Sequence, residues 1–137
     1  MNSQRQSQHR SHHKNRSYKI SKRSIKDDYI DKQVWVIHAA IVDKLLSNPE
    51  MIEQVKETLE NRRETGKIGY GEYITWLSII EVSDQPDLFK RAILENSGKM
   101  KRYRRKTPLV NILTEEEREK AITNGALGTI DDISVLF

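Results

Sequence analysis

Apolar residues recur at intervals of three and four along most of the chain, and this spacing limits what the chain can fold into. Between residues 24 and 47 the pattern is carried by Tyr29, Ile30, Val34, Ile37, His38, Ile41 and Leu45. Such a spacing places the apolar side chains on one face of an α-helix. We therefore expect a first helix that buries this face against the rest of the protein.

Signals for helix starts divide the rest of the chain into further helices. Asn48-Pro49-Glu50 and the segment from Ser83 to Asp87 each place a proline in a first helical turn, and residues 114–117 (TEEE) have the capping-box pattern. Ser97 can cap a short helix that ends near residue 105, because the residue before Pro108 avoids helical geometry. The last helix is expected to end at about residues 124–125 (Asn-Gly).

Residues 73–80 are apolar nearly all round, so we expect this short helix to lie centrally, with Trp76 as a core anchor. No segment has a clear β-strand pattern. The predicted fold is therefore all-α, a compact bundle of about five to six short helices over residues 25–124.

The first 24 residues form a basic arm that lacks acidic residues and is almost without apolar ones. Its cations are Arg5, Arg10, Lys14, Arg16, Lys19, Lys22 and Arg23. Such a segment cannot bury enough surface to offset its ordering entropy, so we expect it to be disordered when unbound. Arms of this kind usually bind phosphate, in DNA, RNA or lipid headgroups, although solubilising the chain is an alternative role.

The overall charge of +4, from 24 lysines and arginines against 20 acids, hides an asymmetry. Eight of the cations lie within the first 26 residues, so the remaining sixteen face all twenty acids and the body is mildly negative. The absence of cysteine excludes disulfides and thiolate metal sites. No apolar run approaches the roughly 20 residues that span a bilayer. A cytoplasmic protein without membrane contact, metal or cofactor is the simplest interpretation.

A second basic cluster places six cations in the eight positions from residue 99 to 106. They are Lys99, Lys101, Arg102, Arg104, Arg105 and Lys106. On a helix they would form a stripe that can follow a phosphate backbone, and Tyr103 among them could stack on a base. The alternatives are an acidic protein partner, or a solvated helix end whose cations favour the negative pole of the helix dipole.

Two other segments carry weaker signals. The glycine-rich stretch 66–73 (GKIGYGEY) matches neither the dinucleotide fingerprint nor the P-loop, so we interpret it as a connector. Arg62 and Arg63 are expected to pair with the glutamates of their own helix.

The sequence contains no convincing catalytic constellation. His38 lies alone on an apolar helical face, which is typical of a core histidine that bonds a neighbouring carbonyl. The alternative is a ribonuclease in which His38 acts as general base and Arg102 or Arg104 clamps the phosphate. An enzyme is the less favoured class.

The C-terminal tail, residues 125–137, ends in TIDDISVLF and is apolar for an unattached tail. Either it docks in a groove of its own domain or it binds a partner chain, and the residues for partner binding would be Ile133, Val135, Leu136 and Phe137.

Residues 103–114 (YRRKTPLVNILT) resemble a stretch with the sequence LRQSSPFAGVLT near the end of small uncharacterised bacterial proteins. The matching positions are Arg104, Thr107, Pro108, Ile112, Leu113 and Thr114, whereas Asn111 stands where these proteins carry a glycine. The similarity extends over roughly residues 33–122 and includes His38, the proline that starts the second helix, and Trp76. The basic arm and the end of the tail lie outside it.

Such proteins tend to be encoded in toxin-antitoxin, mobile-element or defence-type loci, some beside a nucleotidyltransferase-like partner. The resemblance therefore implies a small regulatory protein that binds a protein partner, and the basic segments add a nucleic-acid contact. The alternatives are a ribonuclease-like toxin and an adaptor that does not contact nucleic acid. Oligomeric state is not indicated by the sequence.

Overall fold

The computed structural model describes the backbone of residues 26–136 and the side chains of residues 26–125. The chain divides into two units, Met1–Lys32 and Gln33–Phe137. In the first unit the described residues 26–32 are helical. The predicted phosphate-binding cations of the basic arm, from Arg5 to Arg23, lie outside the described residues.

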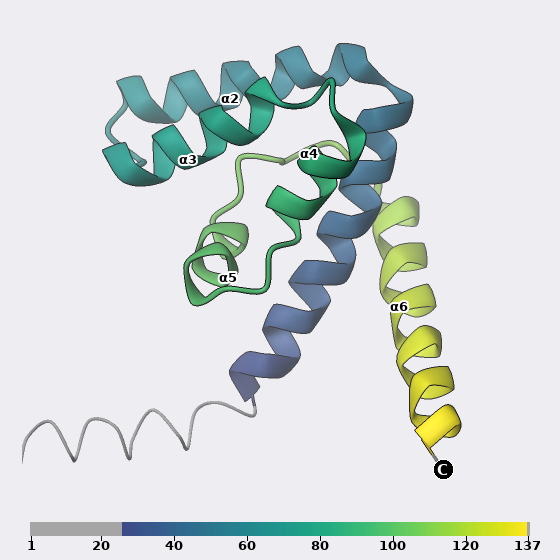
Figure 1. The fold of residues 1–137 in the computed structure, drawn as a ribbon. Helices are drawn as coiled ribbons and strands as arrows, with labels where there is room; N and C mark the ends of the chain where they lie inside the picture. The colour runs from purple at the N-terminus through teal and green to yellow at the C-terminus, as the bar shows by residue number, and fades with distance from the viewer. Residues whose placement is uncertain (1–25, 137) are drawn as a thin grey trace, which may run out of the picture. The chain divides into compact units, whose positions relative to one another are not determined.

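Within the described part of the chain every regular element is a helix, which confirms the predicted all-α fold (Figure 1). Residues 33–47 are helical and lead into a 3₁₀ turn, η1 (Pro49–Met51), which continues into α2 (Ile52–Glu64). The following helices are α3 (Tyr70–Glu81), α4 (Pro86–Ile93), α5 (Gly98–Arg105) and α6 (Glu115–Leu136).

The hydrophobic core of the second unit draws on helices 33–47 and α2 to α5 and on the loop after α5. Its buried apolar residues include Val42, Leu45, Val55, Leu59, Trp76, Ile80, Phe89, Ile93, Met100, Leu109 and Ile112. Trp76 is fully buried, as expected of a core anchor. α2 packs beside α3, and α3 contacts α4 (Figure 1).

The local start signals work in different ways. Ser97 Oγ accepts a hydrogen bond from Met100 N at 3.1 Å and so caps α5. Thr114 and Glu117 form the predicted capping box, with Glu117 N donating to Thr114 Oγ1 at 3.1 Å and Thr114 N donating to Glu117 Oε1 at 2.9 Å. Asn48, by contrast, caps nothing downstream. Its Nδ2 donates to Lys44 O at 3.0 Å, at the end of the preceding helix.

The expected helix end at residues 124–125 is wrong, because α6 continues to Leu136. α6 lies antiparallel to helix 33–47, with Glu117 beside Lys44 and Gly125 beside Val36 (Figure 1). A Cβ atom on Gly125 would lie 2.5 Å from Val36 Cγ1, so this glycine lets two helices approach closely rather than ending one. Residues 125–136 of the tail are thus part of a helix.

The predicted partner-binding residues Ile133, Val135 and Leu136 belong to α6, but their side chains lie outside the described part, as does Phe137 altogether. Among the residues that the structure describes, no helix is long and apolar enough to cross a membrane.

Candidate functional site

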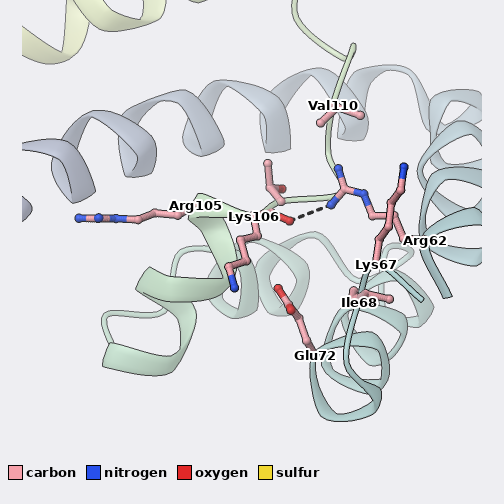
Figure 2. A pocket seen from close by; sticks show the side chains of 8 residues that line it. Arg62, Lys67, Ile68, Glu72, Arg105, Lys106 and Val110 are labelled. Carbon is pink, nitrogen blue, oxygen red and sulfur yellow. Dashed lines mark hydrogen bonds between the residues drawn. The ribbon is translucent and has the colours of Figure 1, made fainter. Parts of the chain in front are cut away.

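A cavity of about 560 Å³ opens between the end of α2, the start of α3 and the chain that follows α5 (Figure 2). Four of its eight lining residues are cationic, namely Arg62, Lys67, Arg105 and Lys106. We call this cavity the cationic pocket. Its remaining lining residues are Ile68, Glu72, Thr107 and Val110, so one carboxylate stands among four positive charges.

The end of α2 places two of these cations side by side. Gly66 adopts a left-handed conformation with φ of 71°, and its N–H donates to Arg63 O at 3.3 Å. The next N–H, of Lys67, donates to Arg62 O at 2.8 Å. This pair of bonds is the Schellman arrangement that closes a helix end at a glycine. Because Ile68 is then buried, the connector is held in place and Lys67 stays beside Arg62.

The opposite wall is fixed by the stretch after α5. Pro108 and Leu109 are buried, and Thr107 Oγ1 accepts a hydrogen bond from Leu109 N at 3.1 Å. Asn111 turns the chain with a φ of 60°, in the left-handed region that glycine enters most readily and asparagine more often than most other residues. These contacts anchor the loop that carries Lys106.

A hydrogen bond between side chain and backbone joins the two walls. Arg62 Nη1 donates to Lys106 O at 2.8 Å, across 44 residues of sequence (Figure 2). A guanidinium has five N–H groups in a planar fork, so Arg62 keeps other donors for a ligand while it holds the wall. The expectation that Arg62 and Arg63 pair with glutamates of α2 is not met in the described residues. Arg63 instead stacks on the rings of Tyr70 and Tyr73, 5.3 and 5.6 Å from their centroids.

Neither lysine of the cationic pocket forms an ion pair with a described carboxylate, although Glu72 lines the same cavity. Among the described residues, the carboxylates that pair with lysines are those of Glu117, with Lys44, and Glu53, with Lys56. Neither pair lies at the cationic pocket, whose lysines 67 and 106 are both exposed. An anionic ligand is therefore the natural complement of this cavity.

The predicted basic cluster splits between the surface and the interior. Lys99, Arg102, Arg105 and Lys106 are exposed and Lys101 is half-buried. Tyr103 is partly buried against the core, with Lys99 Nζ 5.8 Å from its ring centroid.

Arg104 is only 3% exposed, and its Nη1 donates to Ile93 O and Glu95 O at 2.9 Å each. Its guanidinium thus faces the interior and is hydrogen-bonded to the backbone at the end of α4. Arg104 is therefore not part of the candidate ligand surface. Arg62 and Lys67 were not among the predicted ligand-binding residues, because the sequence predicts an ion pair within its own helix for Arg62 and a connector for the segment of Lys67.

His38 is buried, with 2% of its surface exposed, and its Nδ1 lies 2.7 Å from Val34 O. This is the core histidine bonded to a neighbouring carbonyl that the sequence favoured. Burial lowers the pKa of His38 to about 4, a shift that the Val34 carbonyl opposes and the positive charge of Arg104 reinforces. The imidazole is therefore neutral at pH 7.

The structure brings His38 and Arg104 near each other inside the protein and leaves Arg102 on the surface. Neither His38 nor Arg104 lines the cationic pocket. A general base must reach the proton that it removes, and His38 has almost no exposed surface through which a substrate could approach. Among the described side chains, no group of three histidines, aspartates or glutamates is placed to hold a metal ion.

In comparisons with known proteins, no family model matches the chain, and no curated protein or solved structure matches it either. The resemblance of residues 33–122 to small bacterial proteins stays a prediction from the sequence.

Proposed function

We propose that this protein is a small regulatory protein that binds nucleic acid through the cationic pocket and the neighbouring exposed cations of α5. The observation that carries the proposal is that Arg62, Lys67, Arg105 and Lys106 all line one cavity. These side chains come from two segments more than 35 residues apart in sequence. The fold therefore places them at one cavity, and a single charged run could not.

The charge distribution supports a polyanion as the ligand. Residues 27–137 carry sixteen lysines and arginines against twenty acids, yet the cationic pocket has four cations and one carboxylate. Gathering like charges costs free energy through mutual repulsion unless a ligand of opposite sign relieves it. Arginine and lysine are the residues that bind phosphate, arginine through two parallel bonds and lysine as a compact charge.

We propose in addition that the protein binds a protein partner within a toxin-antitoxin or mobile-element type of system, which the resemblance to small bacterial proteins supports. That partner would be of the nucleotidyltransferase-like kind, and it would be contacted by the apolar tail residues Ile133, Val135, Leu136 and Phe137. The buried position of His38 favours this regulatory role over a ribonuclease role.

The proposal is tested by replacing two pocket lysines at once, Lys67→Ala with Lys106→Ala. Each phosphate that the variant no longer neutralises should reduce the slope of log affinity against log salt, by roughly 0.7 for a single strand and 0.9 for duplex DNA. Fluorescence anisotropy with the full chain and a labelled oligonucleotide, over a series of salt concentrations, measures this slope.

A double variant of Lys90→Ala with Lys120→Ala is the matched control, because it removes the same charge from exposed lysines that form no ion pair with a described residue and lie outside the cationic pocket. If both double variants weaken binding and flatten the slope equally, the pocket has no special role. If the wild-type chain binds no oligonucleotide at low salt, the nucleic-acid function itself is excluded.

A further inference from the structure

The carboxylate of Glu72 is the unusual member of the cationic pocket. Figure 2 shows it pointing into the cavity from the first turn of α3. Its Oε1 atom is buried and accepts no hydrogen bond from the described residues. A buried carboxylate oxygen is costly unless a water or a ligand donates to it, and this one belongs to a residue that lines the cationic pocket.

A phosphate alone does not explain Glu72. Ionised phosphate oxygens accept hydrogen bonds and repel a carboxylate, so a purely anionic ligand would leave Oε1 unsatisfied. The full complement of the cationic pocket is a ligand that carries a hydrogen-bond donor next to its phosphate. The cations would hold the phosphate, and the donor would satisfy Glu72.

We propose that this ligand is RNA rather than DNA, an inference that rests on the nucleic-acid function proposed above. The ribose 2′-hydroxyl is a donor that lies beside the backbone phosphate of every ribonucleotide, and DNA lacks it. In this arrangement the Glu72 carboxylate turns about its soft terminal torsion so that the buried Oε1 faces the cavity and accepts from the 2′-hydroxyl, while Arg62 and the pocket lysines hold the adjacent phosphate. The cavity volume of about 560 Å³ falls in the roughly 300–1,000 Å³ range of small-ligand sites, which suits one nucleotide unit.

Glu72 thus acts by discrimination. Its negative charge weakens the binding of any phosphate. Only a strand with a hydrogen-bond donor beside the phosphate recovers this affinity, because the donor bonds to the carboxylate. A site that rejects the analogue lacking one hydroxyl works in the same way, because its own polar group would otherwise stay buried and unpaired.

The experiment compares three single strands of one sequence, made as RNA, as DNA and as 2′-fluoro RNA. The 2′-fluoro sugar keeps the pucker of RNA but has no donor, so it isolates the hydrogen bond. Anisotropy titrations with the full wild-type chain at one salt concentration should show RNA binding roughly tenfold or more tighter than the other two, the usual effect of a hydrogen bond to a charged acceptor. Equal affinity for RNA and 2′-fluoro RNA would overturn the proposal.

Two substitutions on α3 locate the effect. Glu72→Ala should remove most of the preference for RNA while it strengthens the binding of DNA, because a repulsive charge is lost. Glu81→Ala, an exposed site on the same helix outside the cationic pocket, should leave the preference intact. A preference that survives Glu72→Ala would show that another group reads the sugar.

The lysine double variant separates this inference from the function on which it rests. If that variant weakens all three strands but the wild-type chain shows no preference among them, the nucleic-acid function stands and only the role of Glu72 fails. If the variant binds all three as the wild type does, the cationic pocket is not the binding site and both proposals fail.

Discussion

Replacing Arg104 by alanine should destabilise the protein far more than the same change at Arg102, two residues earlier in α5. Arg104 Nη1 donates to Ile93 O and Glu95 O, both at 2.9 Å, and the side chain is 3% exposed. Arg102 lies on the same helix and is exposed. The two substitutions remove the same atoms and the same charge, so their difference measures what the fold does with one of them.

The expected loss for Arg104→Ala is about 3 kcal/mol of unfolding free energy. Each hydrogen bond from a charged donor contributes about 1.5–3 kcal/mol, and the buried Ile93 carbonyl would be left without this donor. Release of a desolvated guanidinium offsets part of the loss of two bonds. For Arg102→Ala the expected change is within about 0.5 kcal/mol, as for most exposed substitutions.

Urea denaturation followed by circular dichroism measures both changes. With a slope near 2 kcal/mol per molar, a loss of 3 kcal/mol lowers the midpoint by about 1.5 M, whereas Arg102→Ala should move it by less than about 0.3 M. Similar midpoints for the two variants would refute the structural role of Arg104 and would indicate that its side chain is exposed, like that of Arg102.

Two further predictions concern the helix pair and the buried histidine. Gly125→Ala should destabilise the protein by about 1–3 kcal/mol, because the new Cβ atom would lie 2.5 Å from Val36, although alanine is the better helix former. Adding Val36→Ala should recover part of this loss. Thermal melts measure both variants, and a single variant that is more stable than the wild type would contradict the close approach of the two helices. The pKa of His38 is about 4 in the folded protein against 6.5 when unfolded, so the unfolded chain takes up the proton first and stability is lost as pH falls from 6.5 towards 4. The unfolding free energy from urea denaturation should fall by about 2 kcal/mol between pH 7.5 and 5 because of His38. In His38→Gln the fall over the same pH range should be smaller by that amount. A fall as large as that of the wild type would exclude His38 as its source.

The sequence predicted the helices well wherever the determining signals are local. Ser97 caps α5, and the capping box of Thr114 and Glu117 starts α6, because each signal acts within three residues. The end of α6 was missed for the opposite reason. Gly125 is a terminator by local preference, but Val36, which lies far upstream, determines its role.

The candidate site could be predicted only in part. Arg105 and Lys106 stand out as members of a dense basic run, yet nothing in the run distinguishes them from Arg104, which the fold buries. Arg62 and Lys67 carry no such signal. Their positions follow from the left-handed turn at residue 66 and from a hydrogen bond to a carbonyl 44 residues away, and neither is visible in composition or spacing.

The end of α4 is completed by two distant parts of the chain. Trp35 Nε1 donates to Leu94 O at 3.1 Å, and Arg104 donates to the carbonyls on either side. These bonds join residues 59, 11 and 9 positions apart, and α4 itself has only eight residues, too few for a helix to persist alone in water. We therefore expect the last turn of α4 to become fully ordered only when the upstream helix and α5 have packed against it, so its amide hydrogens should exchange together with those of its neighbours.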